Sequence, residues 1–348
     1  MPFSLNSLAD LASAPFDDVI DVRSPGEFAE DHLPGAISLP VLSDAEREEV
    51  GTTYGRVDRF KARRIGAAHV SRNAARHLEG PLAEKDGGWR PLVYCWRGGM
   101  RSGSFAHILK EVGWRAEALE GGYRTWRRLV SKALYDDPIS FEVMLIDGNT
   151  GTAKTEILLK AREMGAQAID LEGLANHRGS VFGHMGGQPS QKLFESRLAQ
   201  EVARIDPSRP VLIEAESAKV GERFVPPSLW KAMRAAPRVR IEATLPTRAA
   251  YTARSYADVT GEGGLLRDAL AALVPIQGHA QVDAWRTLAE AGKHEALAAD
   301  LMERHYDPRY AASAIREGAS AAHAVTLDGP DEADIEAAAR AVAGLVTP

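Results

Sequence analysis

The sequence contains only one cysteine, Cys95, among its 348 residues, so it cannot form an internal disulfide. Disulfide frameworks are typical of secreted proteins, and a secretion signal begins with basic residues followed by an apolar run. The segment Met1–Phe16 has no such pattern. We therefore expect a cytoplasmic protein.

Long hydrophobic runs are also missing. Charged residues interrupt every apolar stretch long before it reaches the roughly 20 residues that a membrane-spanning helix requires. We therefore expect that the chain does not span a membrane.

The chain has no excess of positive charge. It carries 42 Lys and Arg against 48 Asp and Glu, a net charge of -6, which argues against indiscriminate binding of nucleic acid. Basic residues nevertheless gather in two segments. The first holds Arg56, Arg59, Lys61, Arg63 and Arg64. The second holds Arg124, Arg127, Arg128 and Lys132. Each segment is either a contact for phosphates or a solvated helix face, and charge alone does not decide between them.

The length and the 45% content of hydrophobic residues fit two domains, each with its own core. Short apolar runs alternate with helical patterns at Ser102–Val112 and Tyr123–Leu134, which predicts an α/β domain with a parallel sheet over residues 1–135. The predicted strands of this domain are Val19–Val22, Ala36–Leu39, Leu92–Tyr94 and Ala116–Leu119.

The alternation stops around Asp136-Asp137-Pro138, where we place the linker, and a second α/β domain follows over residues 136–348. We predict helices at Lys154–Glu163 and Gln191–Ile205. The region 264–312 is helical in pattern, with a break at Gly292, and forms an insertion or an appendix. The predicted strands are Phe141–Ile146, Ala168–Leu171, Val211–Ala215, Val239–Thr244 and Ala324–Leu327.

The segment Tyr94–Ser102 connects a predicted strand to a predicted helix, so its backbone N–H groups should converge on one point. Together with Arg97 and Arg101, these groups should lower the pKa of the Cys95 thiol and make it a nucleophilic thiolate. We therefore predict that Cys95, Arg97 and Arg101 are catalytic. The alternative is that Cys95 is a small buried hydrophobic residue.

The first domain resembles the rhodanese family. In that family the cysteine would hold a persulfide or selenopersulfide, and Asp21 and Arg23 would serve mainly structure. Five residues separate Cys95 from Arg101, whereas ordinary single-domain rhodaneses usually have four. The longer loop is similar to that of cysteine-dependent phosphatases and favours a phosphate-like ligand such as selenophosphate. The resemblance rests on Asp21–Phe28, His32–Ala36, the cysteine loop and Gly121-Gly122-Tyr123.

A second glycine-containing loop lies between a predicted strand and the helix at Lys154, which is the context of a phosphate-binding loop (P-loop). Ala153 replaces the usual glycine before the lysine, while Lys154 still supplies charge and Thr155 a hydroxyl for Mg²⁺. We expect diphosphate binding here; the alternative is a turn without a ligand. The predicted phosphate-binding residues are Gly148, Asn149, Thr150, Gly151, Thr152, Ala153, Lys154 and Thr155.

An acidic residue ends a strand of the second domain, as in related P-loop folds. Glu214 closes the predicted strand Val211–Ala215, and Glu216 follows it. Either one is a candidate for acid–base work or for Mg²⁺, unless both are merely solvated. His177 and His184 have no second cysteine to complete a zinc site, so we predict none.

Motifs along nearly the whole chain resemble the tRNA 2-selenouridine synthase family. These motifs are Cys95–Ser102, Asp170–Glu172, His177–Ser180, Phe182-Gly183, Gln188–Gln191, Glu216-Ser217 and His305–Pro308. The resemblance implies that selenium replaces sulfur in wobble 2-thiouridine of tRNA, with selenophosphate as donor. It further implies a geranylated intermediate made from geranyl diphosphate, and an enzyme that supplies the selenophosphate as a partner.

For tRNA contacts we predict the basic residues of the first segment together with Arg178, because arginine pairs with phosphate and stacks on unstacked bases. Two alternative functions remain at this point. One is a cysteine-dependent phosphatase, which would also need a positioned general acid. The other is a non-catalytic rhodanese module that binds tRNA or protein, joined to a nucleotide switch.

Overall fold

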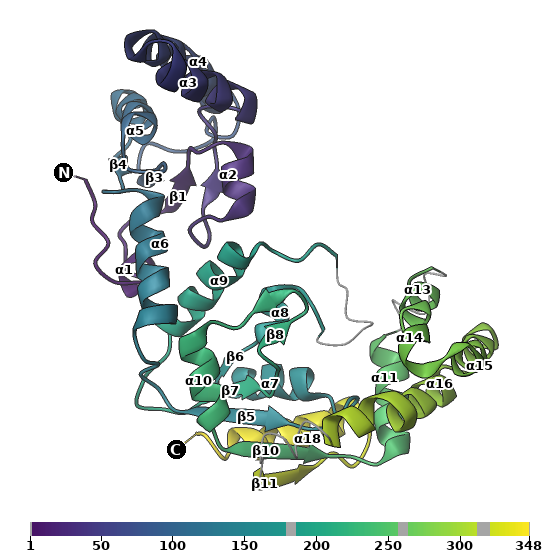
Figure 1. Cartoon of the computed structure of the whole chain (residues 1–348). Coiled ribbons are helices and arrows are strands. Elements are labelled where there is room, and N and C mark those ends of the chain that lie inside the picture. Colours follow the sequence, from purple (N-terminus) through teal and green to yellow (C-terminus); the bar gives the residue numbers. More distant parts are fainter. Residues whose placement is uncertain (1, 179–185, 257–263, 312–320, 348) are drawn as a thin grey trace. The chain divides into compact units, whose positions relative to one another are not determined.

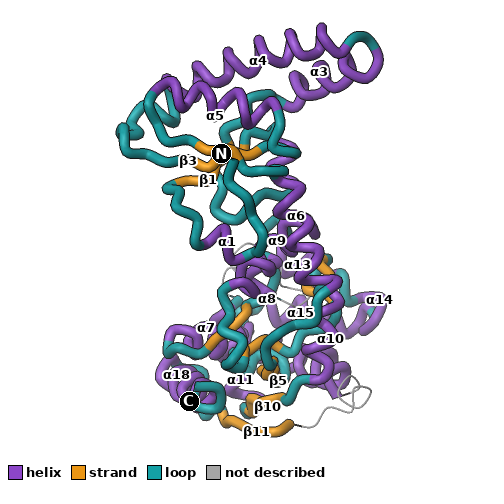
Figure 2. Tube along the Cα trace, turned by 90° about the vertical axis from the view of Figure 1, so that its left-hand side faces the viewer, coloured by secondary structure: helices purple, strands orange, loops and turns teal. Residues whose placement is uncertain are grey.

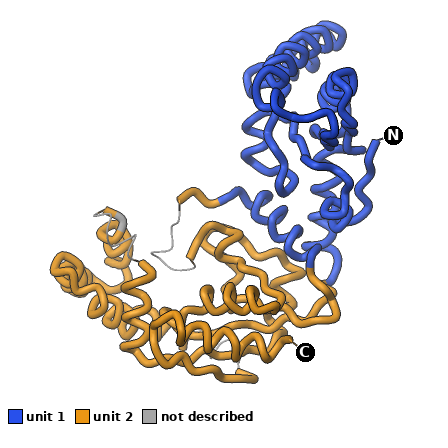
Figure 3. The backbone as a smooth tube through the Cα atoms, turned by 180° about the vertical axis from the view of Figure 1, so that it is seen from behind, with its two compact units in different colours: residues 1–138, 189–204 blue, residues 139–188, 205–348 orange. Residues whose placement is uncertain are grey.

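The structure, a computed structural model, describes residues 2–178, 186–256, 264–311 and 321–347. The chain divides into two compact units, which Figure 3 colours separately. The first contains Met1–Pro138 and Pro189–Arg204, and the second contains Ile139–Gln188 and Ile205–Pro348. No helix in these described ranges is both long and apolar enough to cross a bilayer.

The first unit is built on a four-stranded sheet in the order β2-β1-β3-β4, and all its strand pairs are parallel. The central strand β3 is buried along its whole length, as an apolar run inside a parallel sheet should be. The predicted strands are therefore present, and each of their ends differs from the prediction by at most one residue. Their bounds are β1 Asp18–Asp21, β2 Ile37–Ser38, β3 Pro91–Tyr94 and β4 Glu117–Ala118.

The helix α2 connects β1 to β2, and the helix α5 connects β3 to β4 (Figure 1). Phe105 and Leu109 of α5 are fully buried in the apolar core of the unit, beside Val93 of β3. The helix α6 continues through a π-helical turn, η1, and together they match the helix predicted at Tyr123–Leu134. The bounds are α1 Ala9–Ala12, α2 Pro25–Glu30, α5 Met100–Val112, α6 Tyr123–Ser131 and η1 Lys132–Asp136.

Two long helices, α3 at Asp44–Arg56 and α4 at Arg59–Glu79, form a hairpin for which the sequence analysis predicted no secondary structure. They lie side by side in Figure 2. The side chain of Asp58 caps the second helix by accepting a hydrogen bond from the backbone N–H of Lys61. Most side chains of both helices are exposed, so the apolar stripe that usually reveals a helix in a sequence is weak.

The helix α9, Gln191–Ala203, belongs to the first unit, although the sequence analysis assigned it to the domain 136–348. Trp126 of α6 donates its indole N–H to Ser196 at 3.1 Å. The buried Glu195 pairs with Arg127 and accepts a hydrogen bond of 2.6 Å from Tyr135. These contacts join residues about 60–70 positions apart in the sequence, which a local pattern cannot reveal.

The second unit is built on a five-stranded sheet in the order β11-β10-β5-β7-β6, again with parallel pairs throughout. The central strand β5 leads directly into the glycine-containing loop. The bounds are β5 Val143–Asp147, β6 Gln167–Ile169, β7 Val211–Glu214, β10 Arg238–Glu242 and β11 Ala321–Thr326, with a separate antiparallel pair, β8 Lys219–Val220 and β9 Arg223–Phe224.

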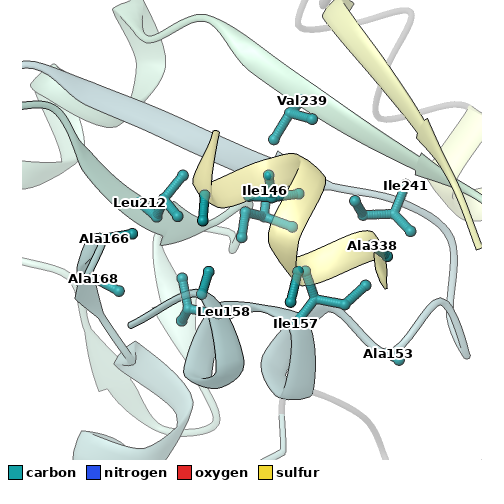
Figure 4. Packing of buried hydrophobic residues seen from close by; sticks show 14 of the residues in the cluster. Ile146, Ala153, Ile157, Leu158, Ala166, Ala168, Leu212, Val239, Ile241 and Ala338 are labelled. Carbon is teal, nitrogen blue, oxygen red and sulfur yellow. The ribbon is translucent and has the colours of Figure 1, made fainter. Parts of the chain in front are cut away.

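The core of the second unit lies between its sheet and two helices, α7 at Lys154–Glu163 and α18 at Glu332–Ala343. Figure 4 shows Ile157 of α7 close to Ile146 of the sheet and to Ala338 of α18. This packing fixes the start of α7, and therefore the loop before it. Outside the helical insertion, the described part of this unit also contains the helices α8 Leu171–Ala175, α10 Pro227–Ala235 and α11 Leu245–Ser255.

The helical region predicted at 264–312 is an insertion, because it precedes the last strand β11 in the sequence. Within it, Trp285, Leu297 and Leu301 are buried in an apolar cluster separate from the sheet core. Gly292, at φ +67°, ends one helix as predicted. The elements are α13 Leu265–Ala271, α14 Val274–Gln277, α15 His279–Glu290, α16 His294–Leu301 and the π-helical turn η2 Met302–Tyr306.

Candidate active sites

Cys95 lies in the loop between β3 and α5, where the sequence predicts a reactive thiol. Its side chain is 4% exposed. The Sγ atom accepts hydrogen bonds from the backbone N–H of Gly99 at 3.3 Å and from the Ser102 hydroxyl at 3.2 Å. The loop and the first turn of α5 therefore direct their donors at the sulfur, which suits a thiolate.

Burial alone would raise the pKa of the Cys95 thiol, since it disfavours the charged form. The hydrogen bond from the Ser102 hydroxyl opposes this effect, and so do the backbone amides of Ser102 and Arg97 and the charge of Arg101. Together they hold the pKa of Cys95 below its usual range. The thiolate fraction at neutral pH is correspondingly larger.

The two arginines of the loop are placed differently. Arg101 forms an ion pair of 2.8 Å with Glu27 of α2, so it acts on the thiol as a nearby charge in a fixed position. Its hydrogen bond and charge outweigh the burial of Glu27 and lower the pKa of that carboxyl. Arg97 is exposed. Glu27 was not predicted as a site residue, although it lies in the motif Asp21–Phe28.

Two glycines allow the cysteine loop to close on the segment after β4. Gly98 has φ +65°, and a Cβ there would lie 2.6 Å from the Leu119 carbonyl oxygen. Gly122 has φ +58°, and a Cβ there would collide with the Cys95 carbonyl oxygen. That same carbonyl accepts a hydrogen bond of 2.8 Å from the backbone N–H of Tyr123. The loop conformation therefore depends on glycine at both positions.

Asp21 and Arg23 stabilise the unit beneath the loop. Asp21 forms a buried ion pair of 2.7 Å with Arg23 and accepts a hydrogen bond of 2.7 Å from the Tyr94 hydroxyl. It also accepts the backbone N–H of Arg23 at 2.9 Å, and the Arg23 guanidinium stacks on the Tyr123 ring at 4.1 Å. These contacts agree with the structural role expected for both residues.

The P-loop follows β5 and ends at α7, as predicted. The Lys154 Nζ folds back over the loop and donates to the carbonyl oxygens of Gly148 at 2.9 Å and Asn149 at 3.4 Å. Ala153 adopts a left-handed conformation at φ +55°. This conformation costs an alanine roughly 1–2 kcal/mol. Strain of this kind is concentrated where loops bind ligands.

Two residues that the sequence analysis did not identify support the P-loop. Arg248 of α11 donates to the Thr150 carbonyl at 3.3 Å and forms a two-pronged ion pair with Asp307, at 2.8 and 2.7 Å. Asp307 also accepts a hydrogen bond of 3.0 Å from the Asn149 side chain. Asp307 lies in the motif His305–Pro308, to which the sequence analysis assigned no role.

Three glutamates gather beside the P-loop. Glu172, Glu214 and Glu216 each offer an oxygen atom, and these atoms lie within 4.8 Å of one another. The Thr155 hydroxyl lies 2.7 Å from Glu214 and 3.1 Å from Glu172. The structure thus brings together both predicted glutamates and adds Glu172, which the sequence analysis quoted only as part of a motif.

The pKa values of this cluster are strongly perturbed. Burial, together with the charges of the neighbouring glutamates, raises the pKa of Glu172 to about 9. Burial is also the main cause that raises the pKa of Glu214 to about 8 and that of Glu216 above its ordinary value. Burial lowers the pKa of Lys154, but electrostatic interactions with Tyr310 and with the neighbouring glutamates outweigh burial, so the pKa of the amine lies above its ordinary value.

The residues predicted to contact tRNA lie in both units. Those of the first segment are exposed at the adjoining ends of α3 and α4. Arg178 donates to the Ser255 carbonyl at 3.3 Å and lies over the Tyr256 ring at 5.3 Å in the second unit. His177 is buried, and His184 falls outside the described residues.

Comparison with known proteins identifies the family. Residues 4–129 match the model of the rhodanese-like domain, and residues 141–272 match that of the tRNA 2-selenouridine synthase AAA domain. The tRNA 2-selenouridine synthase of Cupriavidus necator is 35% identical over 327 residues, which cover 84% of this chain and 87% of that protein. The chain belongs to the tRNA 2-selenouridine synthase family. The protein of the same name from Aeromonas salmonicida is 34% identical, over 87% of this chain and 89% of its own.

Membership of the tRNA 2-selenouridine synthase family confirms the fold class, with a rhodanese-like domain followed by a P-loop domain. It also confirms that the chain is an enzyme of that family, which counts against the non-catalytic alternative. The phosphatase alternative receives no support from these relatives.

Proposed function

We propose that this protein replaces the sulfur of 2-thiouridine at the tRNA wobble position by selenium, with selenophosphate as the selenium donor and a geranylated intermediate. One observation carries the proposal. This member of the family combines a loop in which the pKa of the Cys95 thiol is lowered with a second loop of the phosphate-binding type before α7. A tRNA substrate would place the activity in the cytoplasm.

In the first step, the thiocarbonyl sulfur of the uridine would attack the terminal carbon of geranyl diphosphate. A carbon–sulfur bond forms, the carbon–oxygen bond breaks, and diphosphate leaves. Lys154 would neutralise the charge that develops on this leaving group, and the amides of the P-loop would bind its oxygens. The raised pKa of Lys154 keeps the required positive charge.

A divalent cation such as Mg²⁺ fits the glutamate cluster. Glu214 is 1% exposed, and no donor among the described residues faces its Oε2 atom. Buried oxygens of this kind need a proton or a cation, and carboxylates are ligands that Mg²⁺ prefers. Glu172, Glu214 and Glu216 would hold the ion together with Thr155, and the ion would supply positive charge near the diphosphate.

In the second step, alkylation has made the sulfur a good leaving group. A carbon–selenium bond forms at C2 of the uridine. The bond between C2 and the sulfur breaks, and the sulfur departs with its geranyl group as geranylthiol. Water then cleaves the selenium–phosphorus bond and releases phosphate. Cys95 would act in this step by assisting loss of the geranylthiol, because carriage of selenide-level selenium as a selenopersulfide would require a two-electron oxidant. Arg97 and Arg101 would help to bind the selenophosphate. An enzyme that makes selenophosphate would be a partner.

The basic segment around α3 and α4, with Arg178, would contact tRNA phosphates. Arg56, Arg59, Lys61, Arg63 and Arg64 are all exposed, as that role requires. Binding through such contacts weakens as salt is added, because counterions are released from the nucleic acid.

Reconstitution tests the proposal directly. We expect purified protein to convert a tRNA that contains wobble 2-thiouridine into the 2-selenouridine form when geranyl diphosphate and selenophosphate are both present. Omission of selenophosphate should leave the geranylated nucleoside, and omission of geranyl diphosphate should leave 2-thiouridine. Mass spectrometry of the nucleosides distinguishes the three products. If no new nucleoside forms under any condition, the proposal is wrong.

The glutamate cluster makes the stability depend on pH in a defined direction. Glu172 and Glu214 have pKa values of about 9 and about 8 in the folded protein, above those of an unfolded glutamate. The folded state therefore binds more protons, and the free energy of unfolding falls as pH rises from about 4.5 through 8 to 9.

We expect the Tm to fall on going from pH 6 to pH 9, and Mg²⁺ to restore part of it at pH 9 but little at pH 6. Differential scanning calorimetry measures both effects, and the variant Glu214→Gln should reduce them. Glu201→Gln, on α9, serves as the matched control. Equal Mg²⁺ stabilisation of the Glu214→Gln variant would exclude the cluster as the cation site.

A further inference from the structure

A cavity of about 980 Å³ in the first unit lies beside the cysteine loop, and of the residues that line it the reaction described above uses Arg97. We call it the basic groove. The cysteine loop contributes two of its lining residues, Trp96 and Arg97, and α6 and α9 contribute others. Its aromatic and charged lining residues include Trp96, Arg97, Glu120, Arg124 and Arg128, together with Lys192 of α9.

The charge of the basic groove is strongly positive. Among the described residues that line it, Glu120 is the only acidic one. Arg97, Arg124 and Arg128 are exposed, and within the described part of the chain no ion pair neutralises any of them. Arg124 and Arg128 are four residues apart on α6, so they share one helix face, where like charges destabilise a helix. An anion bound in the groove would offset the repulsion between these two guanidinium groups.

Trp96 gives the groove an exposed aromatic ring. Its side chain is 37% exposed although it follows the buried Cys95 directly. The Trp96 ring packs against the Tyr123 ring, with centroids 5.2 Å apart and an angle of 32° between the planes. The backbone N–H of Arg124 donates to the Trp96 carbonyl at 3.2 Å, which ties this segment to the start of α6. The Trp96 ring is thus partly exposed, is held in place by Tyr123, and lines the same groove as the guanidinium groups of Arg124 and Arg128.

An exposed aromatic ring combined with arginines is the arrangement by which proteins bind single-stranded nucleic acid. The ring stacks on an unstacked base, and the arginines contact the phosphates on either side. A site for an acidic peptide would need the charges but not the aromatic surface. The combination therefore favours RNA over an acidic protein.

We propose that the basic groove binds the single-stranded anticodon loop of the tRNA. Trp96 stacks on an unstacked base, while Arg124 and Arg128 contact the adjacent phosphates. Because Trp96 is the next residue after Cys95, this binding holds the loop nucleotides at the entrance to the cysteine site. The inference rests on the proposed function, and it locates the part of the tRNA that must reach Cys95.

Fluorescence anisotropy with a labelled anticodon stem–loop RNA tests the inference on the full-length protein over a range of salt concentrations. Trp96→Ala should weaken binding by roughly 5- to 100-fold, which is the effect of losing one base–aromatic stack, and Trp96→Phe should restore most of it. The double variant Arg124→Ala/Arg128→Ala should lower the slope of log K against log salt by about 1.4. Lys110→Ala, an exposed lysine of α5 outside the groove, is the control and should bind like the wild type.

The possible results separate this inference from the proposed function. If the wild type binds the RNA and all groove variants bind equally well, the groove is not the binding site, while the proposed function stands. If the wild type does not bind the RNA even at low salt, the proposed function itself fails. Variants that bind RNA normally but lose affinity for polyglutamate would assign the groove to an acidic protein. Circular dichroism and Tm show that each variant is folded.

Discussion

Replacing Cys95 by alanine should abolish the formation of 2-selenouridine, by roughly 10³-fold or more, while the geranylated nucleoside continues to form. Removal of a catalytic nucleophile has effects of this size in other enzymes. The substitution removes the only thiol of the chain and leaves the P-loop of the second unit untouched. Mass spectrometry of tRNA nucleosides measures both products, so the geranylated form should accumulate.

The variant Ser102→Ala serves as a graded control for the role of the thiolate. In the wild type, the Ser102 hydroxyl donates to the Cys95 sulfur at 3.2 Å and helps to lower the pKa of Cys95. Without this hydrogen bond the pKa rises, and the pH profile of alkylation by iodoacetamide should shift to higher pH. Selenation should fall at pH 7 and recover as the pH is raised.

Two outcomes would contradict the assignment of Cys95 to the second step. Loss of both products in a folded Cys95→Ala protein would show that the two steps are not divided between the loops as proposed. An ordinary alkylation rate and pH dependence of Cys95 in the wild type would favour a non-catalytic rhodanese module instead.

Local sequence patterns were enough to predict the two loops. In each case a buried apolar strand leads into a glycine-containing loop and then a helix, and all three parts are consecutive in the sequence, over Pro91–Val112 and Val143–Glu163. The helix α7 has the predicted bounds Lys154–Glu163. Its start could be predicted because Lys154 is part of the P-loop motif, which ends where the helix begins. The family resemblance, carried by short motifs, extended these local predictions to the whole chain.

Contacts between distant residues account for what the sequence analysis did not predict. Asp307 supports the P-loop through Asn149, although 158 positions separate them. Glu172 follows β6 and Thr155 follows β5, and these two strands flank β7, which is a property of the sheet order. The placement of α9 in the first unit depends similarly on buried polar contacts with α6. A pattern of apolar residues carries no information on such pairings.

Replacing Lys154 by alanine should lower the rate of geranylation by roughly 10²- to 10³-fold. This is the usual effect of removing one group that stabilises charge in a transition state. The amine lies over the P-loop, where it donates to Gly148 at 2.9 Å, and its raised pKa keeps it positively charged. Lys160→Ala is a matched control on the same helix, because that lysine pairs with Glu332 at the surface.

The substrate supplied to the Lys154→Ala variant decides whether this lysine acts in the first step alone. With 2-thiouridine tRNA, selenation should fall together with geranylation, since the geranylated nucleoside is its precursor. With tRNA that is already geranylated, selenation by the variant should match that of the wild type, because Cys95 and its loop are unchanged. A variant that fails on both substrates while remaining folded would show that the P-loop also takes part in the selenium transfer.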